Sequence, residues 1–146
     1  MKSIIIWQIL LSFFCASCAV KVPLTEEVIE RYNLSNESVL KKIQYYTSST
    51  IILERSESSS EALLLDRVII PANTKCVLDK LDSYGNFIVR FESGEGGTLN
   101  FNSRKDSKRK YIVADWNDKY GIVYYQNKKY AVTLNSIDCY LMLKLK

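Results

Sequence analysis

Several pairs of acidic residues have the close spacing that acid–base chemistry requires. Within each pair the two carboxylates are three positions apart: Asp79 and Asp82, Glu92 and Glu95, Asp115 and Asp118. Paired carboxylates serve glycoside hydrolases as the acid and as the base or nucleophile. Each pair here lies in or beside a turn signal, where Asp side chains accept hydrogen bonds from backbone amides. We therefore expect turns at these positions and keep a carboxylate-based glycan hydrolase only as an alternative.

The remaining catalytic and cofactor motifs are missing from the sequence. The chain of 146 residues contains no histidine, which excludes histidine zinc sites and Ser–His or Cys–His nucleophile pairs. The glycine-rich segment 94–97 lacks the Lys-Ser/Thr pair of a phosphate-binding loop, and no calcium-loop pattern occurs. We expect no catalytic residue, no bound metal, no cofactor and no small-molecule substrate.

Four cysteines divide between the start of the chain and its body. Cys15 and Cys18 belong to the start, which is treated below. Cys76 and Cys139 leave two interpretations open. As a disulfide in an oxidising compartment they would stabilise the fold by roughly 4 kcal/mol. As separate buried thiols they would act as small hydrophobic residues.

The strongest electrostatic feature is a basic run between two predicted strands. Its positive residues are Arg104, Lys105, Lys108, Arg109 and Lys110. Such a run could bind anionic lipid head groups, lipopolysaccharide, an acidic glycan or an acidic protein, since each positive group near an anionic surface contributes about 1 kcal/mol. A solvated loop is the alternative. Nucleic acid would use the same charges, but the exported character argued below speaks against it.

Aromatic residues gather around one predicted hairpin and form a candidate contact patch: Trp116, Tyr120, Tyr124, Tyr125 and Tyr130. Tyrosine suits recognition surfaces because it combines a large apolar ring with a polar tip. Strand alternation places Tyr124 and Tyr125 on opposite faces, so at most part of the set is exposed together. Packing inside the barrel is the alternative.

The first residues form a typical export signal. Lys2 supplies a basic start, residues 4–14 are an almost unbroken apolar run, and small residues follow at 15–19. This arrangement indicates a secretory signal peptide. The run is too short for a transmembrane helix, which needs about 20 apolar residues.

Two cleavage sites compete after this leader. Residues 15–18 (Cys-Ala-Ser-Cys) resemble a bacterial lipobox, although Cys15 stands where leucine is usual. Cleavage there leaves 1–17 as the signal peptide, Cys18 as the lipidated residue and 18–24 as a tether to the membrane. The alternative is cleavage before Val20, which releases a soluble secreted binding or inhibitor protein.

After the predicted leader and tether, the spacing of apolar residues changes once, near residue 47. Residues 25–46 predict one or two short helices, with Thr25 and Ser35 as candidate N-caps. Residues 47–146 show short apolar runs with turn signals between them, and the polar run 55–61 predicts a mobile loop. We expect a mainly β fold, a small antiparallel barrel or sandwich preceded by these helices.

The first strands of this region resemble those of an SH3-like barrel. The resemblance rests on the segments 69–75 (IIPANTK), 77–82 (VLDKLD) and 86–92 (NFIVRFE). The mature chain as a whole is similar to small exported lipoproteins of unknown function in Bacteroidota, and less specifically to accessory lipoproteins of type VI secretion systems. The resemblance implies a non-enzymatic binding or adaptor module, lipid-anchored at the bacterial outer membrane and facing the periplasm or the cell surface. Its partner would be an envelope protein or a surface polymer.

Overall fold

The computed structural model describes residues 20–59, 62–91, 97–103, 108, 110–113, 116–117 and 120–144, with backbone only at 56–59, 62–65, 116–117 and 120. The predicted signal peptide over 1–17, Cys18 and three basic residues, Arg104, Lys105 and Arg109, lie outside this part of the chain. In chain order the elements are β1 Lys21–Pro23, α1 Glu26–Arg31, α2 Glu37–Leu40, β2 Tyr45–Thr47, β3 Ile51–Ser59, β4 Ala62–Ile70, β5 Lys75–Leu81, β6 Phe87–Phe91, β7 Thr98–Ser103, β8 Tyr111–Val113, β9 Trp116–Asn117, β10 Tyr120–Tyr125, β11 Lys128–Val132, the 3-10 helix η2 Leu134–Ser136 and β12 Leu141–Lys144.

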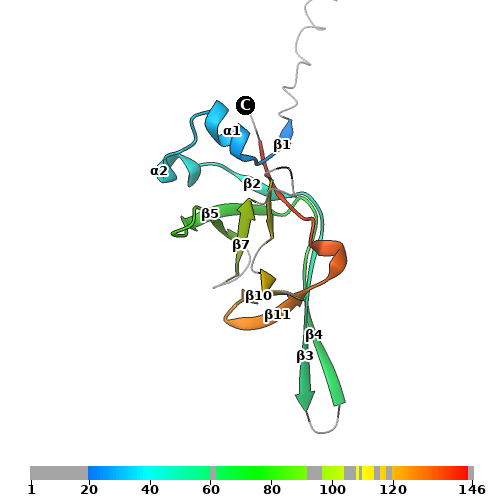
Figure 1. The fold of residues 1–146 in the computed structure, drawn as a ribbon. Coiled ribbons are helices and arrows are strands. Elements are labelled where there is room, and N and C mark those ends of the chain that lie inside the picture. The colour runs from blue at the N-terminus through cyan, green and yellow to red at the C-terminus, as the bar shows by residue number, and fades with distance from the viewer. Residues whose placement is uncertain are drawn as a thin grey trace, which may run out of the picture.

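The strands form two antiparallel sheets. A seven-stranded sheet has the order β1-β12-β2-β5-β6-β7-β8, and a five-stranded sheet has the order β4-β3-β11-β10-β9. This arrangement confirms the prediction of a mainly β, antiparallel barrel or sandwich with two short helices near its start (Figure 1). The closer likeness to an SH3-like barrel stays a prediction.

The seven-stranded sheet curves until its two ends meet. Single antiparallel bridges join Ile112 of β8 to Tyr140 and Lys110 to Thr25. The backbone amide of Tyr111 also donates to the carbonyl of Leu24 at 3.2 Å. Strand β8 therefore lies beside the residues that follow β1 and beside the residue that precedes β12. These contacts close the seven-stranded sheet into a barrel-like shape.

The expectation that residues 18–24 form a tether is wrong for residues 21–23, which form strand β1. Lys21 pairs with Lys144 and Pro23 with Met142, and Leu24 is fully buried. The backbone of residues 21–23 pairs with the edge of β12, so this segment belongs to the barrel. The expected helical segment over 25–46 is likewise shorter, because Tyr45 and Tyr46 already belong to β2.

The β3–β4 hairpin extends away from the rest of the molecule (Figure 1). Its two strands pair without a break from Ile51 opposite Ile70 to Ser59 opposite Ala62. The expected mobile loop over 55–61 is therefore wrong for residues 55–59, which are strand. The ladder to the apolar, β-favouring partner strand outweighs the polar composition of this segment.

One hydrophobic core joins the elements of both sheets. Aromatic rings cross its middle, with the centroids of Tyr45 and Phe87 5.9 Å apart and those of Phe87 and Tyr111 4.6 Å apart, both edge-to-face. Such pairs add stability beyond the area they bury. In β12, Leu141 and Leu143 face this core and alternate with Met142 and Lys144.

Candidate binding groove

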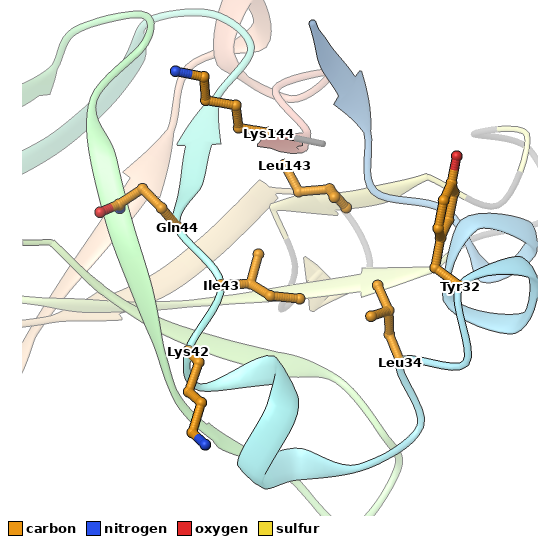
Figure 2. A pocket seen from close by; sticks show the side chains of 7 residues that line it. All are labelled: Tyr32, Leu34, Lys42, Ile43, Gln44, Leu143 and Lys144. Atoms are coloured by element: carbon orange, nitrogen blue, oxygen red, sulfur yellow. The ribbon is translucent and has the colours of Figure 1, made fainter. Parts of the chain in front are cut away.

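A groove of about 490 Å³ lies where the helical segment meets the end of the barrel. Its lining combines the segment after α1, the segment that leads into β2, and the end of β12: Tyr32, Leu34, Lys42, Ile43, Gln44, Leu143 and Lys144. Figure 2 shows the side chains of Leu34, Ile43 and Leu143 facing one another across the groove. This volume is within the range of small-molecule sites.

The helix side of the groove is built by the way α1 ends. Asn33 adopts a left-handed conformation with φ 51°. The backbone amide of Leu34 then donates to the carbonyl of Ile29 at 2.8 Å, and that of Asn33 donates to Glu30 at 3.1 Å. This pair of hydrogen bonds is a Schellman motif with Asn in the place of Gly. It turns the chain sharply and directs Leu34 toward the barrel.

Each of the two helices begins at a side chain that caps its first turn, one at the predicted residue and one a residue later. The hydroxyl of Thr25 accepts a hydrogen bond from the amide of Val28 at 3.1 Å, which confirms Thr25 as an N-cap. The N-cap of α2 is Asn36, whose side chain accepts from the amide of Ser38 at 2.8 Å, so the prediction of Ser35 is wrong by one residue. Farther along, Glu26 accepts a hydrogen bond from the hydroxyl of Ser103, which attaches α1 to β7.

The barrel side of the groove is held by buried contacts. Leu143 is almost fully buried in β12. The side-chain amide of Gln44 donates to the carbonyl of Cys76 at 2.9 Å, which fixes the segment before β2 to β5. Ile43 is half-buried against the core. The apolar walls therefore belong to the folded body of the protein and are formed before any ligand arrives.

Two lysines give the groove its charge. Lys42 and Lys144 are both exposed, and within the described parts of the chain neither forms an ion pair. The neighbouring Lys41 differs, because its ammonium lies 2.8 Å from the carboxylate of Glu37. The groove thus has apolar walls, positive rims that no carboxylate of the described residues neutralises, and no acidic residue in its lining.

Cys76 and Cys139 are buried as separate thiols. Cys139 donates from Sγ to the carbonyl of Ser49 at 3.3 Å. Cys76 lies in β5 opposite Tyr45 and Phe91. The structure thus differs from the disulfide interpretation and agrees with the alternative of two small core residues.

The basic run is divided by the fold, as far as it is described. Lys108 is exposed, with φ 53°, and lines a small cleft together with Thr25, Glu27 and Glu30. Lys110 pairs with Thr25, and its ammonium lies 4.3 Å from the centre of the Tyr140 ring. Of the two described lysines, Lys108 is thus exposed beside α1, whereas Lys110 is held against the barrel.

The structure shows that only part of the predicted aromatic contact patch is exposed. Tyr125 and Tyr130 are buried, whereas Tyr124 is 66% exposed. The hydroxyl of Tyr130 donates to Asp66 at 2.9 Å. A Cβ on Gly97 would lie only 2.7 Å from the Tyr125 hydroxyl, so the missing side chain makes room for the ring. The side chains of Trp116 and Tyr120 lie outside the description.

The described residues contain no group of His, Cys, Asp and Glu side chains that could hold a metal ion. In the same part of the chain no helix has the length and apolar character to span a bilayer. In the comparisons with known proteins, no family model, no curated protein and no solved structure matched this chain.

Proposed function

We propose that this protein is an exported, lipid-anchored binding module of the bacterial cell envelope that carries out no reaction itself. The observation that carries the proposal is the position of β1. This strand begins at Lys21, only three residues after the lipobox cysteine Cys18, and it pairs directly with β12 of the barrel. Three residues span at most about 10 Å. A lipid on Cys18 would hold this end of the barrel against the bilayer.

The shape of the molecule supports such an orientation. The β3–β4 hairpin extends from the body on the side away from β1 (Figure 1). With β1 at the membrane, the hairpin would reach outward, toward an envelope protein or a surface polymer. The groove, which borders Lys144 and hence the partner strand of β1, would lie on the membrane side.

Replacing the two leader cysteines in turn tests the anchor. We expect Cys18→Ala to remove lipidation and membrane association, because no other residue can take the thioether-linked lipid at this site. Cys15→Ala is the matched control and should leave the protein in the membrane fraction. Mass spectrometry of the mature N-terminus should find Cys18 with its acyl chains. A mature chain that begins at Val20, or an intact chain that begins at Met1, would overturn the proposal.

A further inference from the structure

We propose that the groove binds a single-chain anionic amphiphile, a long-chain fatty carboxylate, with its hydrocarbon chain between Leu34, Ile43 and Leu143 and its carboxylate at the lysine rim. This inference goes beyond the proposed function and does not depend on the lipid anchor. It rests on three features of the groove: its apolar walls, two lysines that form no ion pair within the described residues, and the position of its polar groups.

The walls favour a hydrocarbon chain. Figure 2 shows three branched aliphatic side chains converging on the same space from two different segments and β12. Tyr32, which is 49% exposed, flanks them with its ring. Leu143 is almost fully buried, but the exposed parts of Leu34, Ile43 and Tyr32 are removed from water when an apolar ligand covers them, which is favourable. Because the surface is concave and already formed, the ligand need not order the protein in order to bind.

The rim favours a negative charge on that ligand. Lys42 and Lys144 lie at the edges of the groove, with Gln44 between them along the barrel wall (Figure 2). Both ammonium groups sit on flexible four-carbon stems and can turn toward an anion at the mouth. Among the described residues no carboxylate neutralises either of them. A neutral or cationic amphiphile would lack this attraction.

The two lysines also determine the orientation of the ligand in the groove. Their ammonium groups stand on the outer side of the aliphatic cluster and not within it (Figure 2). A carboxylate placed at the mouth keeps its contact with water and with a lysine, while the chain is removed from water. Burial of the charge in the apolar part would cost far more than the pairing returns.

A photoreactive fatty acid tests the proposal on the processed protein in its native form. The probe is a palmitate that carries a diazirine near its terminal carbon, and the comparison probe is the alcohol of the same length. We expect the palmitate probe to crosslink to peptides that contain residues 32–44 or 141–144, and excess unlabelled palmitate to prevent it. Labelling spread over the whole surface and unaffected by palmitate would indicate contact with bilayer lipid only and would overturn the proposal.

Variants of the rim separate charge from apolar contact. Lys42→Gln combined with Lys144→Gln should raise the half-saturating concentration of the palmitate probe about fivefold, the loss of one lysine–carboxylate contact. The alcohol probe should be unaffected. Lys41→Gln is the matched control, since Lys41 is paired with Glu37 and does not line the groove. Equal binding of palmitate to the double variant and to the control would refute the role of the rim.

A variant of the wall tests the apolar part. Leu34→Asp places a charge in the groove at a loop position that is half-buried, and it should abolish crosslinking of both probes. An unchanged melting temperature of this variant shows that the barrel is intact. If Leu34→Asp unfolds the protein, Leu34→Ala serves instead, and it should weaken both probes equally. Unchanged crosslinking by a folded variant would contradict the placement of the chain.

Discussion

The hydroxyl of Tyr45 donates a hydrogen bond of 3.0 Å to the carbonyl oxygen of Leu40. Tyr45 is the first residue of β2 and Leu40 the last of α2, and both are buried. The contact therefore connects the helical segment to the barrel directly beside the groove. Burial, together with the nearby Cys76 thiol, raises the pKa of the Tyr45 hydroxyl well above its ordinary value.

Tyr45→Phe should lower the free energy of unfolding by about 1 kcal/mol, the usual net contribution of one intramolecular hydrogen bond. The loss stays moderate because the carbonyl of Leu40 still accepts from the amide of Ile43 at 3.2 Å. Urea unfolding monitored by circular dichroism measures it. Tyr84→Phe is the control, since Tyr84 is 89% exposed and should change stability by less than about 0.5 kcal/mol. An equal effect of the two substitutions would contradict the assignment.

Alkaline pH should destabilise the protein through the same residue. The unfolded chain releases the proton of Tyr45 above about pH 10, whereas the folded chain retains it to higher pH. The unfolded state therefore binds fewer protons, and the free energy of unfolding falls by about 1.4 kcal/mol per pH unit from this group. Denaturant midpoints between pH 9 and 11 measure the slope. Tyr45→Phe should show a shallower slope than the parent protein.

Acid should destabilise the β5–β6 turn. The carboxylate of Asp82 accepts hydrogen bonds from the amides of Tyr84 and Asn86 at 2.8 and 2.9 Å. Partial desolvation acts to raise the pKa of Asp82, but these bonds and those from the side chains of Asn86 and Asn100 outweigh it and hold the pKa below its ordinary value. The contribution is present above the unfolded pKa and is lost as pH falls through the folded one.

Melting temperatures between pH 7 and 2 test this contribution. The parent protein should lose stability below about pH 4, near the ordinary Asp pKa. Asp82→Asn keeps a hydrogen-bond acceptor without the titrating charge, so its profile should be flatter over this range. Parallel profiles for the two proteins would show that the carboxylate has no such role.

Gly85 in the same turn should not tolerate a side chain. Its φ is +79°, although a Cβ there would meet no atom within 4 Å. The cost of Gly85→Ala therefore comes from backbone conformation alone and should be about 1 kcal/mol. Gly85→Asn should cost less, because Asn adopts left-handed conformations more readily. Chemical denaturation compares the two variants, and equal losses would contradict the backbone explanation.

Thiol labelling distinguishes the two states of the core cysteines. Cys76 and Cys139 are fully buried, so a thiol reagent should modify neither in the native protein and both after unfolding in urea without reductant. Peptide mass spectrometry locates the label. Tyr84→Cys supplies an exposed control that should react at once. Unfolded protein that takes up no label before reduction would reveal a disulfide.

Local patterns in the sequence predicted much of the fold. Strand alternation placed Tyr124 and Tyr125 on opposite faces, and in the structure Tyr124 is exposed and Tyr125 is buried. Thr25 was recognisable as an N-cap because capping depends on a side chain and an amide three residues away. Each of these features is decided within a few positions along the chain.

Contacts between distant segments were not predictable in this way. Val22 and Pro23 contain no strand signal of their own, and they form β1 only because β12 offers an unpaired edge. The polar residues of β3 are held in a strand by the partner strand. The groove was missed for the same reason: Leu34, Ile43 and Leu143 look like ordinary core residues until the fold brings them together.

Closure of the barrel depends on residues that are far apart in the sequence. Residues 21–25 pair with Lys110 and with β12, so this early segment finds its strand partners only after residues 110–144 have been synthesised. Long-range pairing of this kind slows folding, since loop-closure entropy must be overcome first. The growing polypeptide consequently cannot complete this part of the barrel until residues 141–144 have been made.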